Sequence, residues 1–413
     1  MTDLDYPRLL RSRLEEALDD TPVVLIHGPR QCGKSTLAQK VGEARGYEYF
    51  SFDDVNLLAA AQADPVGFVD RLPEKVILDE VQHVPELFSS IKQIVDRDRR
   101  AGRFLLTGSA NVLLLPKLAD SLAGRMEVLE LRPLARCEIE NSGEGLLPQI
   151  LRNDFTFRCA GKLGRGLAAL VVEGGFPEPL TRKSQRRKDS WYLNYVDTLV
   201  QRDIRDLARI SSLDTVPRIL QLAATQSAQL LNMSKIAAPF RISRPTVSAY
   251  FTLLQNIFLL DVLPAWHSNR VKRLVKTPKV HMVDTGLAAA VLGVTANQLD
   301  ADRSRLGHLL ESFVYNELRR QASGACCDVR FYHYRDKDKV EVDIVMEESG
   351  GSIAAVEVKA SASVFDKDFR GLRKLRAAVG KDWKTGIVLY DGERILPFGE
   401  GMHAVPISAL WAK

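Results

Sequence analysis

Residues 28–35 read Gly28-Pro29-Arg30-Gln31-Cys32-Gly33-Lys34-Ser35 and match the phosphate-binding pattern G-x-x-x-x-G-K-[ST]. The apolar residues 23–26 precede this loop, and the helix-forming residues 36–40 follow it. In this order, backbone N–H groups of the loop point inward at a helix N-terminus, where they can cradle phosphate oxygens. A chance glycine-rich turn would lack this context. The stretch therefore predicts a nucleoside triphosphate site on an α/β fold.

A second apolar strand ends in two acids, Val76-Ile77-Leu78-Asp79-Glu80. Near-continuous apolar runs are typical of buried parallel strands. In combination with the phosphate loop, Asp79 is predicted to hold Mg²⁺ through water and Glu80 to activate the attacking water. Lys34 is predicted to reach the β- and γ-phosphates, and Ser35 to ligate Mg²⁺. The full predicted nucleotide-binding set is Gly28, Pro29, Arg30, Gln31, Cys32, Gly33, Lys34, Ser35, Thr36, Asp79 and Ser109.

Two further segments belong to the same predicted sheet. Small polar residues follow the apolar residues 103–106, and Thr107, Ser109 or Asn111 either sense the γ-phosphate or cap the next helix. Arg125 stands just before another strand-like run, residues 126–131. It is predicted to reach the nucleotide of a neighbouring subunit as an arginine finger, which requires an oligomer. The alternative is a surface arginine.

These segments together resemble the AAA+-type ATPase module of a widespread prokaryotic family whose members carry a C-terminal domain of unknown function, DUF4143. The resemblance covers residues 1 to about 140, with GPRQCGKSTL, VILDEVQHVPEL, FLLTGSANVLLLPKLADSLAGR and LELRPLARCEIE in the family order. Cys32 stands where a small apolar residue is usual, at a position that packs rather than reacts. The resemblance assigns ATP hydrolysis to Lys34, Ser35, Asp79 and Glu80, with Arg125 as the arginine finger.

The middle of the chain is predicted to contain a helical segment followed by a winged-helix domain. Residues 146–212 are expected to form a helical lid or linker, and the shared Gly-Gly-Phe-Pro turn and Arg-Asp-Ile tripeptide extend the family resemblance here. Arg202 or Arg205 either contacts nucleotide or forms a salt bridge on the helix surface. Residues 213–300 are expected to form the winged-helix domain.

The helix-turn-helix pattern lies in residues 233–260. Ser243 is a good N-cap and Pro245 suits a first helical turn. Strands near residues 258–262 and 279–283 would form a wing around a basic stretch that neutralises DNA phosphates. The alternative is a winged helix kept for protein contacts. The predicted nucleic-acid contacts are Arg244, Thr246, Ser248, Arg270, Lys272 and Arg273.

Residues 301–413 contain a second chemical pattern on a helix followed by strands. Glu311 lies in an amphipathic helix, Asp343 in a strand, and Glu357 and Lys359 share one face of the next strand. The three acids are predicted to hold Mg²⁺ and Lys359 to position a water near a scissile phosphate. This pattern resembles the PD-(D/E)XK nuclease superfamily. The alternative is a salt-bridge cluster in an inactive nuclease-like fold.

The composition indicates the cellular environment in which we expect the protein to act. The chain has 413 residues, 46% hydrophobic and 26% charged, and no apolar run of membrane-spanning length, so we expect a soluble cytoplasmic protein with no signal peptide and no membrane partner. Its five scattered cysteines are expected to be reduced, and residues 1–145 to be the ATPase core.

Three alternative functions are compatible with these sequence patterns. The first is an oligomeric DNA-dependent ATPase, a hexamer or similar ring that uses ATP and Mg²⁺, remodels or translocates DNA and cuts it. The second is a DNA motor or branched-DNA binder, including a branch-migration ATPase, whose nuclease fold does not cleave. The third is a nucleotide-switched regulator or toxin-antitoxin-type protein that acts on a partner protein.

Overall fold

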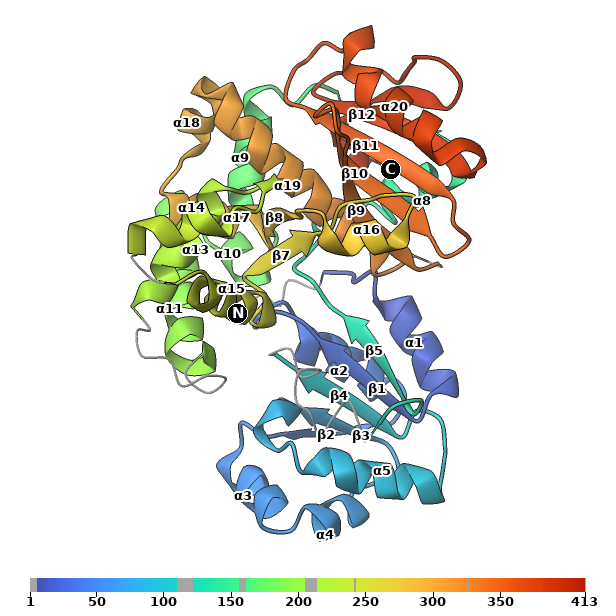
Figure 1. Cartoon of the computed structure of the whole chain (residues 1–413). Coiled ribbons are helices and arrows are strands. Elements are labelled where there is room, and N and C mark those ends of the chain that lie inside the picture. Colours follow the sequence, from blue (N-terminus) through green and yellow to red (C-terminus); the bar gives the residue numbers. More distant parts are fainter. Residues whose placement is uncertain are drawn as a thin grey trace. The chain divides into compact units, whose positions relative to one another are not determined.

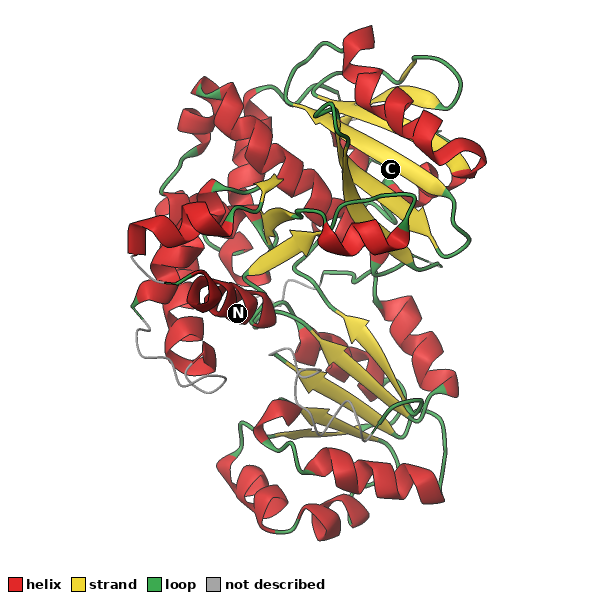
Figure 2. Ribbon diagram, viewed as in Figure 1, coloured by secondary structure: helices red, strands yellow, loops and turns green. Residues whose placement is uncertain are grey.

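The computed structural model describes residues 6–109, 122–155, 161–204, 214–240, 243–325 and 327–412. They form two compact units, one mainly Arg8–Pro133 and the other mainly Leu134–Gln255 with Leu259–Lys413 (Figures 1 and 2). The smaller unit covers Arg8–Pro133 with Asn256–Phe258, and the predicted domain boundaries at residues 145, 212 and 300 stay predictions. None of the helices in the described ranges combines the length and apolar character needed to cross a bilayer.

A five-stranded parallel sheet organises the smaller unit, in the order β2-β3-β4-β1-β5. Its strands are β1 (Val23–His27), β2 (Glu48–Ser51), β3 (Val76–Asp79), β4 (Phe104–Gly108) and β5 (Met126–Glu130). The helices are α1 (Arg11–Asp20), α2 (Lys34–Glu43), α3 (Val55–Ala63), α4 (Pro65–Asp70), the short η1 (Val81–His83) and α5 (Leu87–Arg97). The predicted parallel α/β fold is confirmed.

Alternation along the strands explains why helices cover both faces of this sheet. Val23 and Leu25 pack in the same apolar cluster as Phe88 and Ile91 of α5. The intervening Val24 belongs to a second cluster, which contains residues of α1 and α2. Successive side chains of a strand point to opposite faces, so a continuous apolar run needs a cover on each side.

The larger unit begins with helices: α7 (Arg136–Ile139), α8 (Leu147–Arg152), α9 (Arg165–Glu173), α10 (Pro177–Leu180), α11 (Gln185–Leu199) and the π-helical η3 (Val200–Ile204). It continues with α13 (Thr215–Thr225), β6 (Gln229–Leu230), α14 (Met233–Ala237), η4 (Ala238–Phe240), α15 (Arg244–Asn256), β7 (Leu260–Leu263), α16 (Arg270–Val275) and β8 (Lys279–Met282). Strands β6, β8 and β7 form a three-stranded antiparallel sheet.

The C-terminal part is built on a mixed six-stranded sheet, ordered β13-β14-β12-β11-β10-β9. Helices α17 (Thr285–Leu292), α18 (Ala296–Ala301) and α19 (Arg303–Ala322) precede it. The sheet and its remaining helices are β9 (Val329–Arg335), β10 (Glu341–Glu348), β11 (Ile353–Lys359), η5 (Asp366–Phe369), α20 (Arg370–Val379), η6 (Gly380–Asp382), β12 (Trp383–Tyr390), β13 (Leu396–Pro397), β14 (Met402–Pro406) and η7 (Ile407–Trp411).

The two sheets of the larger unit are joined through the backbone. Trp266 N donates to the carbonyl of His333 at 2.6 Å, and His333 N donates to that of Pro264 at 2.9 Å. This bonding extends the chain after β7 alongside β9. Both the middle and the C-terminal segments lie in this compact unit.

Candidate functional site

The phosphate loop joins β1 to α2 and has the backbone shape that its glycines permit. Gly33 is the N-cap of α2 with φ 98°, and Gly28 has φ 148°. A Cβ atom at Gly28 would lie 2.1 Å from the carbonyl oxygen of Leu131. Glycine is therefore required at Gly28 by space as well as by conformation.

Lys34 holds the loop closed from within. Its side chain is 5% exposed, and Nζ donates to the carbonyl oxygens of Gly28 at 3.1 Å and Pro29 at 2.7 Å. Both acceptors are neutral carbonyl groups, so neither balances the positive charge of the buried ammonium. The mouth of the loop is therefore suited to an anion.

Arg8 donates hydrogen bonds to the backbone of the loop and of a neighbouring segment. No pattern in the sequence predicted this role. Its guanidinium donates to the carbonyl oxygens of Cys32 at 2.7 Å and Arg132 at 2.6 Å. Cys32 is buried, and its Sγ lies 3.3 Å from the carbonyl oxygen of Leu131. Burial raises the pKa of this thiol, which suits a packing role.

Asp79 at the end of β3 lies beside the loop. It accepts hydrogen bonds from Ser35 Oγ at 2.9 Å, from the Tyr49 hydroxyl at 2.5 Å, and from the hydroxyl of Thr107. Tyr49 on β2 has no sequence signature that predicted this contact. The hydroxyl of Ser35 and the carboxylate of Asp79 are the hard oxygen donors that Mg²⁺ prefers. These residues fit a Mg²⁺–triphosphate complex.

Glu80 follows Asp79 in the left-handed conformation, with φ 57°. Its N–H donates to Thr107 Oγ1 at 3.2 Å, and Gln82 Nε2 donates to its carboxylate and to Ser109 Oγ, the latter at 3.0 Å. Burial alone would raise the pKa of Glu80, but Lys34, Gln82 and Arg30 together hold it below its ordinary value. Glu80 is therefore an ionised carboxylate at neutral pH, as a general base must be.

Other predicted residues around the loop are placed as follows. Thr36 is exposed in the first turn of α2, and Gln31 has φ 58°. Arg202 is exposed on η3. Asn111 and Arg205 lie outside the described residues.

Arg125 lies just before β5, at the amino end of the strand. Because β5 is parallel to β1, this end is opposite the edge that carries the phosphate loop. Its guanidinium pairs with Asp96 of α5 and donates to the carbonyl oxygen of Ala123 at 3.1 Å. The finger role stays a prediction and would require a neighbouring subunit.

Helix α15 separates an apolar face from a polar one. Val247, Tyr250, Phe251 and Leu254 are buried, while Arg244 and Ser248 are exposed and Thr246 is half-buried. As predicted, Ser243 caps the helix, accepting from Thr246 N at 3.3 Å.

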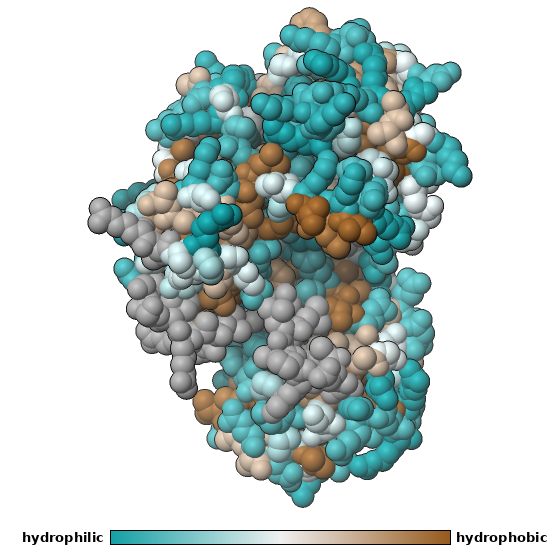
Figure 3. All heavy atoms as spheres, viewed as in Figure 1, coloured by the Kyte–Doolittle hydropathy of each residue, from teal (hydrophilic) through white to brown (hydrophobic). Residues whose placement is uncertain are grey.

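The predicted basic wing instead contains a helix, α16, whose apolar side chains are outside. Val271, Leu274 and Val275 are 70–86% exposed, and a brown patch lies over α16 in Figure 3. Arg270 and Lys272 are exposed. Arg273 turns inward: it pairs with Glu347, and its guanidinium carbon lies 5.3 Å from the ring centre of Trp266.

Lys279 enters the predicted nuclease site from β8. It is 2% exposed, and its Nζ lies 2.6 Å from Glu311 Oε1 and 3.3 Å from Asp343 Oδ1. Burial alone would lower the pKa of Lys279, but the charges of Glu311 and Asp343 raise it, so the ammonium stays charged. Lys279 begins the strand predicted near residues 279–283, and no local signal in the sequence links it to residues 311 and 343.

The other two members of the pattern pair with each other. Lys359 Nζ donates to Glu357 Oε1 at 2.7 Å, and Val358 N donates to Asp343 Oδ2 at 2.9 Å. Burial and the nearby charge of Asp343 raise the pKa of Glu357 to about 8. Within the described ranges, no three His, Cys, Asp or Glu side chains converge to hold a metal ion. As they stand, the acids hold ammonium groups and do not fit Mg²⁺.

The parallel sheet and its phosphate loop define the fold of a P-loop ATPase. Residues 20–140 match the family described as an AAA domain, residues 306–410 match the domain of unknown function DUF4143, and residues 164–298 match the domain of unknown function DUF8612. The chain therefore carries an AAA domain followed by a C-terminal DUF4143 domain, and the predicted combination is confirmed.

Similar proteins span most of this chain. An uncharacterized protein of Mycobacterium tuberculosis is 28% identical over 397 residues, 96% of this chain and 82% of that protein. An uncharacterized protein of Methanocaldococcus jannaschii is 22% identical over 327 residues, 76% of this chain and 70% of that one. Among solved structures, a Walker-type ATPase of Pyrococcus abyssi is similar with a TM-score of 0.44 and 17% identity, over 68% of this chain and 94% of that one.

Proposed function

We propose that the protein hydrolyses ATP with Mg²⁺ and couples hydrolysis to remodelling or translocating DNA, as a hexamer or similar ring. The observation that carries the proposal is the convergence of Lys34, Ser35, Asp79 and Glu80 at one edge of the parallel sheet. Lys34 and the loop N–H groups would hold the triphosphate, Ser35 and Asp79 its Mg²⁺, and the metal would neutralise charge on the phosphates. Glu80 takes the proton of the attacking water.

Substituting Lys34 by alanine tests the hydrolytic part of this proposal. The Lys34→Ala variant should bind ATP at least tenfold more weakly and hydrolyse none above background, because the only buried cation of the loop is lost. Lys40→Ala, an exposed lysine of the same helix, is the matched control and should keep its activity. Unchanged hydrolysis by Lys34→Ala would show that this loop is not the catalytic site.

The DNA-binding part of the proposal rests on the helix-strand arrangement of residues 215–282. Helices α13, α14 and α15 with the sheet β6-β8-β7 have the order of a winged helix, and the exposed face of α15 carries Arg244 and Ser248. In such domains the second helix of the helix-turn-helix enters the major groove. We retain Arg244, Thr246, Ser248, Arg270 and Lys272 as DNA contacts, but not Arg273, whose guanidinium is engaged with Glu347.

An electrophoretic mobility or anisotropy titration with duplex DNA tests this interface. Arg244→Ala should weaken binding about tenfold and reduce the slope of log K against log salt by about one. Arg186→Ala on α11, which is also exposed and lies outside the proposed interface, should change neither value. Equal affinity of Arg244→Ala and the native protein would remove α15 from the interface.

For the C-terminal domain we propose that it holds DNA without cutting it. The pairing of Lys279 with Glu311 and Asp343 favours this alternative over Mg²⁺-dependent cleavage. The native protein should leave linear, branched and single-stranded DNA intact in millimolar Mg²⁺. Cleavage that is lost in both Asp343→Ala and Lys359→Ala would overturn this part and restore the nuclease assignment.

A further inference from the structure

Gln82 links the ends of two neighbouring parallel strands beside the candidate ATP site. It lies on η1, shortly after β3, and its side-chain amide contacts Ser109, the residue directly after β4. The same amide is bonded to the carboxylate of Glu80, the proposed general base. Gln82 therefore connects the general base to a second strand of the sheet.

The amide of Gln82 uses its donors and its acceptor at once. Nε2 donates one hydrogen bond to the Glu80 carboxylate and another to Ser109 Oγ, the latter at 3.0 Å. Oε1 accepts from Ser109 N at 3.4 Å. The reversed amide would place its oxygen against the carboxylate and its NH₂ group against the N–H of Ser109. These contacts therefore define a single orientation of the Gln82 side chain.

The turn that carries Gln82 is anchored in the apolar core. Val81 is 1% exposed and Val84 is fully buried, and both pack in the same cluster as Leu106 of β4. His83 N donates to the carbonyl oxygen of Glu80 at 3.1 Å and closes the turn. The Gln82 side chain therefore extends from a fixed backbone, so it can hold another side chain in place.

Glu80 is a residue whose conformation needs support. Its backbone is left-handed, with φ 57°, and strained conformations of this kind cost about 1–3 kcal/mol unless their surroundings impose them. Thr107 Oγ1 accepts from the N–H of Glu80 at 3.2 Å, and Ser109 holds the amide that bonds its carboxylate. The end of β4 thus fixes the backbone of Glu80 directly and its side chain through Gln82.

We infer that Gln82 is a positioning residue for hydrolysis: together with Ser109, it fixes the orientation in which the Glu80 carboxylate receives the proton of the attacking water. A general base must be within hydrogen-bond reach of the proton that it takes. The inference rests on the proposed ATPase function. Because Gln82 acts through Glu80, its loss should slow the chemical step and leave nucleotide binding in place.

Substituting Gln82 in the full-length protein tests this role. Gln82→Met keeps the length of the side chain but removes its hydrogen bonds, and should lower kcat about 10²-fold at saturating ATP. The Kd for a non-hydrolysable ATP analogue should stay within about twofold of the native value. Gln82→Glu, which has the same shape but places a second carboxylate against Glu80, should lower kcat at least as far. Thermal unfolding checks that both variants fold.

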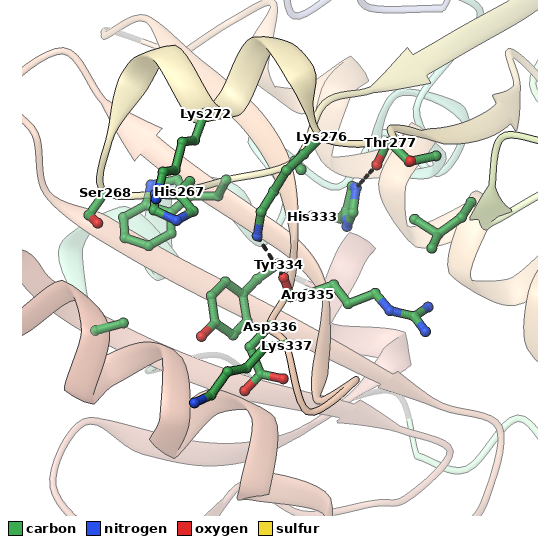
Figure 4. Close-up of a pocket in the computed structure, with 14 residues that line it drawn as sticks. His267, Ser268, Lys272, Lys276, Thr277, His333, Tyr334, Arg335, Asp336 and Lys337 are labelled. Atoms are coloured by element: carbon green, nitrogen blue, oxygen red, sulfur yellow. Dashed lines mark hydrogen bonds between the residues drawn. The ribbon is translucent and has the colours of Figure 1, made fainter.

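Two control variants measure the general effect of such changes. Gln93→Met makes the same substitution at an exposed position of α5 and should keep the native turnover. Lys276→Met removes a hydrogen bond between two segments of the larger unit, from Nζ to the carbonyl oxygen of Arg335 (Figure 4). This variant should also keep the native turnover in the absence of DNA.

A double-mutant cycle tests whether Gln82 and Ser109 act as one unit. Ser109→Ala should lower kcat about tenfold, because the amide of Gln82 loses its second support. Adding Ser109→Ala to Gln82→Met should lower kcat by no more than about threefold further, whereas independent roles would multiply.

The outcomes separate this inference from the proposed function. A native protein that hydrolyses no ATP would overturn both. Hydrolysis that is lost in Glu80→Gln but kept within about twofold in Gln82→Met would overturn the role of Gln82 alone. A matching loss of affinity for the ATP analogue in Gln82→Met, or multiplying effects in the cycle with Ser109, would also overturn it.

Discussion

Lys279 places an ammonium group between Glu311 and Asp343, and this single side chain changes the chemistry expected of the C-terminal domain. A protein loses far less stability when both partners of a buried ion pair are replaced by apolar residues than when only one partner is removed. Mg²⁺ would have to displace the ammonium before it could reach the two acids. The lysine and the metal are therefore competitors for one site.

Removing this lysine should destabilise the larger unit. We expect Lys279→Ala to lower the free energy of unfolding by about 3–5 kcal/mol, because Glu311 and Asp343 remain buried without a partner. Urea denaturation measures the change, and Lys381→Ala on the surface should stay within about 0.5 kcal/mol of the native protein. Millimolar Mg²⁺ should restore stability to Lys279→Ala and leave the native protein unaffected. A variant as stable as the native protein would contradict the pairing.

Substituting Glu80 separates the rate of ATP hydrolysis from the affinity for ATP. Glu80→Gln should lower the rate of ATP hydrolysis by about 10²–10⁴-fold while ATP affinity stays within about threefold, because the amide keeps the shape but cannot accept the proton. Steady-state turnover and an ATP-binding titration measure the two quantities. Glu43→Gln at the exposed end of α2 is the control. A parallel loss of binding and turnover would assign Glu80 to binding instead.

Local sequence patterns were sufficient to predict the contacts of residues whose partners lie in neighbouring elements of a known order. Lys34, Ser35 and Asp79 are examples, because a loop after one strand and an acid after another meet at the carboxyl edge of a parallel sheet. Arg8, Tyr49 and Lys279 were not predictable in this way. Each reaches its partner across the fold from a segment with no distinctive pattern.

At the scale of elements, the phosphate loop depends on the closeness of Gly28 to the turn after β5. Gly28→Ala should displace the loop and weaken ATP binding at least tenfold, because its Cβ would lie 2.1 Å from the Leu131 carbonyl oxygen. Gly46→Ala is the matched control: Gly46 has φ 76° but no atom within 4 Å of the added Cβ, so it reports backbone strain alone. Equal ATP affinity in the two variants would show that the clash is relieved without moving the loop.

Elements were predicted more reliably than their arrangement. The apolar runs around residues 76–79, 104–108 and 126–130 indicated strands, and the structure contains β3, β4 and β5 there. The position of β4 between β1 and β3 could not be predicted from these runs, because an apolar run does not indicate which strand it pairs with. Helix α16 was missed because its cluster of lysines and arginines resembled a solvated loop.

At the scale of the whole molecule, the question is whether Arg125 acts on a neighbouring subunit. Arg125→Ala should reduce ATP turnover about 10³-fold if it is the finger. Mixing Arg125→Ala with Lys34→Ala, each inactive alone, should restore part of the activity, because one supplies an intact loop and the other an intact finger. Full activity of Arg125→Ala would show that its role is the ion pair with Asp96.

The segments of the larger unit are joined by direct contacts. The backbone bonds between Trp266 and His333 and the insertion of Lys279 into the C-terminal cluster join residues predicted to lie in separate domains. DNA bound at α15, as proposed, would therefore contact the same compact unit that contains the six-stranded sheet. These contacts join segments distant in the chain, so no local pattern in the sequence indicates them.

The rate of ATP hydrolysis with and without DNA tests the central claim most directly. The account predicts that duplex or branched DNA raises the turnover of the native protein several-fold, that Lys34→Ala shows none with or without DNA, and that Arg244→Ala needs about ten times more DNA for the same rise. ATP hydrolysis that no form of DNA alters would contradict a DNA-coupled ATPase and favour a nucleotide switch acting on a partner protein.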